Sequence, residues 1–327
     1  MNKKLLAIAV AAFVAAPAIA SAQTTLFGQV KYEVGYVDGL NFDAEGEPDG
    51  TSDHNLVHST KGTRLGVHGS EDLGGGMSAI FRFQGGLGGV NRGMQNTDWT
   101  MNEENWVGLR GGFGTLQLGR SDTAMKKTGG NHFRAFTDTQ AEPALIPGRT
   151  TRADGVHYTS PNIAGFTGYL TLEPNGVETD TYWAIGADYR MGAFYFSAAY
   201  EASPDTGTFQ VGTTDESNYQ VGAKWNFGQG DVGLLYQALN DGDDDVFVVP
   251  VNFKVTPNVN LRAAALYASP DEGSSYTNWG VGAQYMFSPR TEAFANVWVL
   301  DQDIARDNGT TFSADSTNFG LGLRHSF

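Results

Sequence analysis

The chain has no cysteine among its 327 residues, so disulfides cannot hold its fold together. After residue 22 it also lacks an apolar run approaching the roughly 20 residues that a membrane-spanning helix requires. Basic residues are few, because 21 Lys and Arg stand against 36 Asp and Glu, a formal net charge of −15. Such an acidic chain is a poor partner for nucleic acid. These absences exclude a disulfide scaffold and a helical membrane protein.

What is present is glycine and aromatic residues in a polar background. There are 43 glycines, 12% of the residues are aromatic, and the mean hydropathy is −0.29. A soluble exported β protein and a transmembrane β-barrel both fit this composition. A barrel needs strands whose alternate faces are apolar and polar.

The first residues have the anatomy of a secretory signal peptide. Two lysines at positions 3 and 4 precede an apolar run, Leu5–Ala16, and the small residues Ala20, Ser21 and Ala22 follow. This order predicts export and cleavage before Gln23. Residues 1–22 are therefore expected to be removed, which leaves a single β-barrel domain at residues 23–327. With its 19 basic and 36 acidic residues that domain has a formal charge of −17.

The remaining chain alternates apolar and polar residues with a period of two, which indicates β-strands. In Leu26–Tyr36, for example, Val30 and Tyr32 share one face while Gln29 and Lys31 share the other. The same alternation returns in these segments: Arg64–His68, Ala79–Gln84, Tyr182–Tyr189, Tyr219–Phe227, Asn260–Tyr267 and Asn318–Phe327. Each segment has about the length of a tilted membrane-spanning strand.

The connections between these strands alternate between short and long. Tight turns are expected at Glu71–Gly76, Thr256–Asn258 and Ser288–Arg290, where Gly, Pro and Asn supply the dihedral angles that turns need. The long polar connections are Asp38–Ser59, Gly88–Asn102, Ser121–Thr151 and Ser203–Asp215. Short turns at one end and long loops at the other are typical of outer-membrane barrels, and we count sixteen antiparallel strands. A barrel of that size leaves an aqueous lumen.

Aromatic residues gather near the expected strand ends, which we interpret as girdles at the two membrane interfaces. The residues are Tyr32, Tyr36, Phe194–Phe196, Tyr285, Phe287 and Trp298.

At this level of detail the chain resembles the trimeric general porins of Gram-negative outer membranes. Thr63–Gly74 is similar to the family's second strand and turn, Trp106–Arg120 resembles its fourth and fifth strands, and Gly155–Pro161 resembles the segment after its constriction loop. The chain also ends on a terminal aromatic residue, Phe327, as the family does. The resemblance extends from the signal peptide to the C-terminus and implies that the barrel-assembly machinery reads this last strand.

The resemblance also implies a constriction in which the long third loop, Ser121–Thr151, folds into the barrel opposite basic wall residues. The expected basic wall residues are, in order of preference, Arg64, Arg152, Arg82 and Lys31. The expected acidic loop residues are Asp138, Glu142 and Asp122. Two positions depart from the family pattern, because relatives often have a basic residue where this chain has Glu103 and Gln29. The family's Pro-Glu-Phe-Gly signature at the loop tip is also absent.

These observations predict a passive channel for ions and small hydrophilic solutes across the bacterial outer membrane. The acidic chain and the two missing wall cations favour weak cation selectivity. A channel specific for a sugar or an anion is the alternative, and a structural or adhesive β protein is a more distant one. An enzyme is not expected, since neither a Gly-x-Ser-x-Gly elbow nor a His-Glu-x-x-His helix occurs.

The expected partners also follow from the resemblance. They are two further copies of the chain in a homotrimer, latched through Gly88–Asn102, together with outer-membrane lipid and lipopolysaccharide and the barrel-assembly machinery. We expect no cofactor and no metal ion. The acidic runs Asp43–Asp53 and Asp241–Asp245 could bind divalent cations, but solvated loops are the better interpretation.

Overall fold

The computed structural model describes the chain from Gln23 onward, with gaps in several connections. The described residues are 23–42, 48–59, 61–87, 99–101, 103–142, 152–174, 181–203, 216–271, 275–301, 303–305, 311–313 and 315–327. The expected signal peptide and most of the Gly88–Asn102 connection lie outside them. Among the described residues, none of the helices combines the length and the apolar character needed to cross a membrane.

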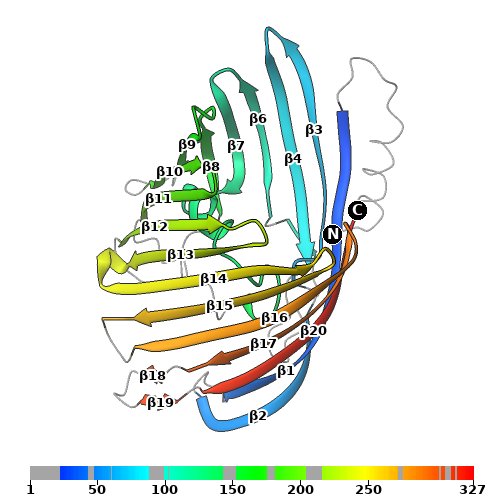
Figure 1. Cartoon of the computed structure of the whole chain (residues 1–327). Coiled ribbons are helices and arrows are strands. Elements are labelled where there is room, and N and C mark those ends of the chain that lie inside the picture. The colour runs from blue at the N-terminus through cyan, green and yellow to red at the C-terminus, as the bar shows by residue number, and fades with distance from the viewer. Residues whose placement is uncertain are drawn as a thin grey trace.

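Strands make up almost all of the described chain (Figure 1). They are β1 (Gln23–Phe42), β2 (Pro48–Ser59), β3 (Arg64–Gly74), β4 (Met77–Leu87), β5 (Trp99–Thr100), β6 (Asn105–Gly111), β7 (Gly114–Asp122), β8 (Arg152–Thr159), β9 (Phe166–Glu173), β10 (Tyr182–Met191), β11 (Phe194–Ser203), β12 (Glu216–Asn226), β13 (Gly230–Leu239), β14 (Asp244–Thr256), β15 (Val259–Ser269), β16 (Tyr276–Ser288), β17 (Thr291–Leu300), β18 (Asp303–Ala305), β19 (Thr311–Ser313) and β20 (Ser316–Ser326). Two short helical segments are η1 (Lys126–Gly130) and η3 (Asn240–Gly242).

The strands close into an antiparallel barrel because the first pairs with the last. Gln29–Tyr36 of β1 run antiparallel to Phe319–Ser326 of β20, and the two strands lie side by side in Figure 1. The other edge of β1 pairs first with β3 and then with β2, so β2 and β3 are one interrupted strand. Strands β5 and β6 likewise share the neighbour β4. Counting each interrupted strand once gives the sixteen predicted strands; β18 and β19 form a separate hairpin.

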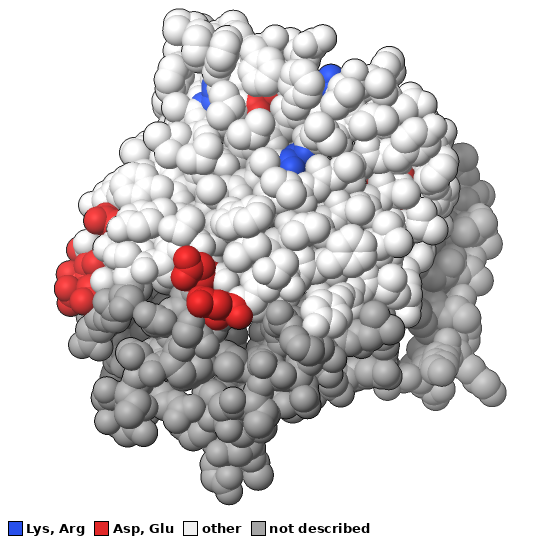
Figure 2. All heavy atoms as spheres, turned by 60° about the horizontal axis from the view of Figure 1, so that its bottom comes forward, with Lys and Arg blue, Asp and Glu red and all other residues white. Residues whose placement is uncertain are grey.

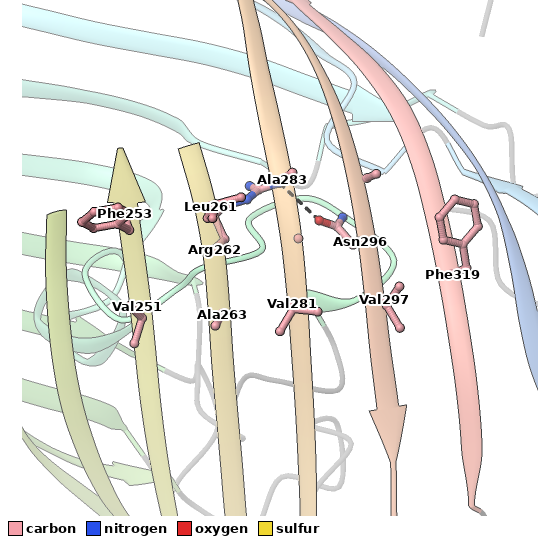
Figure 3. Close-up of a pocket in the computed structure, with 12 residues that line it drawn as sticks. Val251, Phe253, Leu261, Arg262, Ala263, Val281, Ala283, Asn296, Val297 and Phe319 are labelled. Carbon is pink, nitrogen blue, oxygen red and sulfur yellow. Dashed lines mark hydrogen bonds between the residues drawn. The ribbon is translucent and has the colours of Figure 1, made fainter. Parts of the chain in front are cut away.

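The two faces of the sheet differ as the alternation predicts. In β1, Val30 and Tyr32 are more than half exposed on the outer face, whereas Gln29, Lys31 and Glu33 are buried on the inner face. Farther round the barrel, Figure 3 shows a shallow apolar groove on the outer wall across β14 to β20. Outer side chains lining it include Val251, Phe253, Leu261, Val281, Val297 and Phe319. The wall is therefore apolar towards lipid and polar towards the lumen, the arrangement of a transmembrane barrel.

The short turns lie at one end of the barrel, as predicted. Between β3 and β4 the consecutive residues Gly74, Gly75 and Gly76 all have positive φ, from 62° to 77°, a conformation that costs glycine little. The side chain of Asp72 accepts a 2.8 Å hydrogen bond from the Gly74 amide. Tight turns also join β14 to β15 and β16 to β17, which confirms the turns expected at Thr256–Asn258 and Ser288–Arg290.

Two expectations about the wall are wrong. The segment Asp38–Ser59 is mostly strand and not a long loop, because β1 continues to Phe42 and pairs with β2 as an extended hairpin. Trp298 does not belong to an interface girdle, because it faces the lumen and is only 3% exposed. Tyr195, in the expected Phe194–Phe196 girdle, also points inward and is 7% exposed. Both inner aromatic side chains belong to an apolar cluster beneath the third loop.

Candidate functional site: the charged constriction

The loop between β7 and β8 enters the barrel and begins by docking on the inner faces of β9 to β12. Its η1 helix is held by Gln220 of β12, whose amide donates to the carbonyl of Met125 at 2.7 Å and to the hydroxyl of Thr128 at 2.8 Å. The hydroxyl of Tyr195 on β11 donates to the Thr128 carbonyl at 3.2 Å. These bonds satisfy loop carbonyls that the barrel would otherwise bury without partners.

Two loop phenylalanines then fit against positions of the wall that lack a side chain. A Cβ added to Gly222 would overlap the ring of Phe133, and one added to Gly233 would lie 3.0 Å from the same ring. A Cβ added to Gly282 would likewise lie 3.0 Å from the ring of Phe136, and the guanidinium of Arg262 lies 5.4 Å from the centroid of that ring. Figure 3 shows the hydrogen bond from Arg262 of β15 to Asn296 of β17, which passes over the inner face of β16. Glycines in three strands therefore let the loop approach the wall closely.

The loop tip reaches the far side of the barrel and contacts β1, β20 and the segment before β3. Arg324 of β20 donates to the carbonyl of Thr137 at 2.8 Å, and the backbone amide of Gln140 donates to Glu33 of β1 at 3.0 Å. The loop thus follows the inner wall from β7 past β12 to β1. This path confirms that the third loop folds into the lumen.

Asp138 and Arg64, two of the predicted site residues, meet at this tip. The Arg64 Nη2 atom lies 3.4 Å from Oδ2 of Asp138, and the amide of Gln29 donates to the same oxygen at 3.3 Å. Burial alone would raise the pKa of Asp138, but the charges of Arg64 and Arg324 outweigh it and hold that pKa below its ordinary value of 3.8. Asp138 is therefore an anion at neutral pH.

Glu142, another predicted acid, is largely buried and organises the loop from within. Its carboxylate pairs with Arg134 at 2.8 Å and with Lys61 at 3.0 Å. It also accepts a 2.9 Å hydrogen bond from the amide of Asp138. Asp138 has a positive φ of 61°, and the Glu142 bond helps hold that conformation.

Arg152, Arg82 and Asp122 lie on the other part of the wall, near the root of the loop. Arg152 pairs with Glu103 at 2.6 Å and with Asp122 at 3.3 Å, and Asp122 also binds Lys126 at 2.5 Å. Arg82 pairs with Glu104 at 2.9 Å and stacks 4.5 Å from the ring centroid of Phe27. Each of these predicted residues therefore has an oppositely charged partner close by.

Lys31 points inward, as its phase in β1 predicts, but the loop covers it. Its side chain is completely buried and pairs at 2.7 Å with Glu33, which is also completely buried. Glu33 in turn accepts the bond from the loop amide of Gln140. Lys31 therefore stabilises the loop's docking surface and is not among the water-exposed charges.

Several charged residues of the site were not selected from the sequence. Glu33 and Arg324 anchor the loop tip, Lys61 pairs with Glu142, and Glu104 pairs with Arg82. The period-two pattern of β1 and β20 places Glu33 and Arg324 on the inner face, so these two residues could have been predicted. Glu104 gave no such signal, since it precedes β6 in an irregular segment.

A closed sixteen-stranded barrel with a polar lumen and an inward-folded loop lined by ion pairs defines a membrane channel. Comparison with known proteins agrees, because a family model described as Gram-negative porin matches residues 7–305. The chain belongs to this family of outer-membrane channels, which are not enzymes.

The curated relatives are similar over their whole length. The major outer membrane protein P.IB of Neisseria lactamica is 28% identical over 358 aligned residues, which cover 100% of both chains. The protein of the same name from Neisseria meningitidis serogroup A is 27% identical over 351 residues, again covering 100% of both.

Solved structures show the same fold. The anion-selective porin from Comamonas acidovorans matches with a TM-score of 0.71 and 22% identity, covering 94% of this chain and 100% of that one. Outer-membrane expressed OmpT of Vibrio cholerae matches with a TM-score of 0.69 and 15% identity, covering 95% and 99%.

Proposed function

We propose that this outer-membrane channel is a general diffusion pore for ions and small hydrophilic solutes, with a weak preference for cations. The observation that carries the proposal is the charged, water-exposed wall beside the loop. The side chains of Lys61, Arg64 and Arg82 are 36%, 32% and 30% exposed, and each pairs with a carboxylate. Because opposite charges alternate there, the described part of the constriction carries no large excess of either sign, which favours weak selectivity.

The acidic mouth at the long-loop end adds to the cation preference at low ionic strength. Exposed carboxylates follow or precede the strands there, at Asp241, Asp243, Asp271, Asp301 and Asp315. Figure 2 shows acidic side chains gathered in two groups on one side of the visible face, while charged side chains are sparse on the rest of that face. A negative rim raises the local concentration of cations at low ionic strength.

Four inner aromatic residues of the described chain are too buried to guide a sugar, which favours a general pore over a sugar-specific one. Phe27 is partly exposed, but it stacks on Arg82. A sugar track needs aromatic faces open to the water column, but Tyr182, Tyr195, Phe294 and Trp298 are each no more than 7% exposed. Liposome swelling with neutral sugars of increasing size tests this point. A general pore admits them at rates that fall smoothly with size, whereas fast uptake of a single sugar would support the specific alternative.

We also propose that the mature chain, residues 23–327, assembles as a homotrimer. The resemblance to trimeric porins supports this assembly, and the latching segment expected at Gly88–Asn102 lies mostly outside the described residues. The barrel-assembly machinery and lipopolysaccharide are the further proposed partners. Native mass measurement of unheated protein in mild detergent should give three times the monomer mass, and a single monomeric species would contradict the trimer.

A further inference from the structure

The wall strand formed by β5 and β6 carries a bulge at the level of the constriction. Gly86 of β4 is opposite Thr100, and Phe83 is opposite Asn105. The chain between Thr100 and Asn105 is therefore longer than the stretch opposite it, which holds only Gln84 and Gly85. The side chain of Asn105 fixes the bulge, donating to the Met101 carbonyl at 2.8 Å and to that of Gln84 at 3.2 Å.

The bulge lets two consecutive carboxylates, Glu103 and Glu104, both contact residues on the inner face of the wall. In a regular strand, adjacent side chains point to opposite faces, so only one of Glu103 and Glu104 could meet lumen residues. Here Glu103 accepts a 3.3 Å hydrogen bond from the inward-facing Gln84 and pairs with Arg152. Glu104 pairs with Arg82, which is inward-facing as well. Bulges commonly redirect a side chain in this way.

These carboxylates complete a belt of alternating charge along the wall between the tip and the root of the loop. Asp138 pairs with Arg64 at the tip, and Arg64 is opposite Gly86, whose inner side faces Glu103. Glu103 pairs with Arg152, and Arg152 with Asp122 at the loop root. The side chains of Glu103 and Glu104 are 22% and 19% exposed, so water and passing ions can approach them.

Given the proposed channel function, we propose that Glu103 and Glu104 are the residues that determine the channel's ion selectivity. Their two negative charges offset Arg82 and Arg152, which without them would present a positive wall to the water column. Charges that face a narrow column act on every passing ion, whereas charges on outer loops are screened within roughly 8 Å at physiological salt. The bulge is thus the feature that keeps this channel from favouring anions.

Reversal potentials across planar bilayers in a potassium chloride gradient test the proposal. We expect the double variant Glu103→Gln, Glu104→Gln to lower the ratio of potassium to chloride permeability at least about threefold, the effect of one unit charge several ångströms away in water. The shift should shrink in 1 M salt, where the screening length falls to roughly 3 Å. Arg82→Gln removes a positive charge from the same belt and should shift the ratio the opposite way.

Glu71→Gln is the matched control, because Glu71 is exposed near the β3–β4 turn at the opposite end of the barrel. It should leave the ratio unchanged. A double variant that conducts normally with wild-type selectivity would overturn the proposal. If the double variant does not insert into the bilayer, the single variants Glu103→Gln and Glu104→Gln and the variant Arg82→Gln test the proposal instead. Wild-type selectivity in all three would also overturn the proposal. A wild-type protein without conductance would instead refute the proposed channel function.

Discussion

Arg64 of the barrel wall and Asp138 of the third loop form an ion pair across the lumen surface, with 3.4 Å between Nη2 and Oδ2. The pair joins the tip of the loop to the strand β3, and the Gln29 amide supports the same carboxylate. It is therefore both a part of the charged belt and a tether of the loop that narrows the channel.

Removing this tether should change both the selectivity and the steadiness of the current. Asp138→Asn leaves Arg64 without its anion, so permeability should shift about twofold towards chloride, and current noise should rise as the loop tip loosens. Single-channel recording in a salt gradient measures both. Asp72→Asn is the control, since that residue is exposed and caps the β3–β4 turn, away from the loop. Identical effects from both variants would contradict the assigned role.

Phe133 should be necessary for a steady constriction. Its ring is 2% exposed and fills the space over Gly222 and Gly233, and replacing a buried Phe by Ala costs about 3–5 kcal/mol. We expect Phe133→Ala to produce larger and noisier conductance steps. Phe247→Ala removes an equal side chain from the outer wall, where the ring is 38% exposed, and should conduct like the wild type. If Phe133→Ala has the conductance and the current noise of the wild type, other contacts hold the loop in place.

His132 makes loop docking sensitive to acid. Burial, followed by the positive charge of Arg190, lowers its pKa from 6.5 to about 4, although Asp188 opposes the shift. The docked loop therefore binds fewer protons than a released loop between these values, so docking weakens as pH falls from 6.5 to 4. Above pH 6.5 this contribution is fully present.

We accordingly expect current noise to rise between pH 6.5 and pH 4 in the wild type. His132→Phe keeps a ring against Tyr195, which lies 4.2 Å away between centroids, and should remove the change in that window. Asp138 titrates at a lower pH, since its pKa lies below 3.8, so its own contribution disappears only in more acidic solution. Noise that rises equally in His132→Phe would assign the effect to another group.

Phe327 is predicted to act in assembly. Its backbone exchanges hydrogen bonds of 3.0 and 3.1 Å with Gly28, and these do not need the aromatic ring. Phe327→Ala should therefore lower the amount of folded barrel in the outer membrane several-fold, while channels that do assemble conduct normally. The folded fraction is measured by the heat-dependent shift in gel mobility. Phe319→Ala on the same strand is the control, and an equal loss in both variants would indicate general destabilisation.

Much of the barrel could be predicted from the sequence, because the period-two alternation records which side of the wall each residue faces. Val30 and Lys31 lie on the faces that this pattern assigns them. Trp298 was misplaced because an aromatic residue near a strand end is compatible with a lipid girdle and with a cluster beneath the loop. Only the docked loop distinguishes these two environments.

The site itself could be predicted only in part. The phase of a strand places Arg64 and Lys31 inside, but it cannot tell that the loop buries Lys31 and leaves Arg64 open. The role of Glu104 depends on the bulge between β5 and β6. At the bulge, consecutive side chains no longer alternate between the two faces of the strand, so the sequence pattern does not predict which face Glu104 occupies. The three glycines that accept Phe133 and Phe136 come from separate strands, so their relation exists only in the closed barrel.

Conductance across a planar lipid bilayer tests the central claim most directly. Purified protein should give uniform, stepwise increases in current, arriving in groups of three if the trimer forms, with a small reversal potential of cation sign in a potassium chloride gradient. A protein that inserts into the membrane and yet carries no current would contradict the assignment of a water-filled channel.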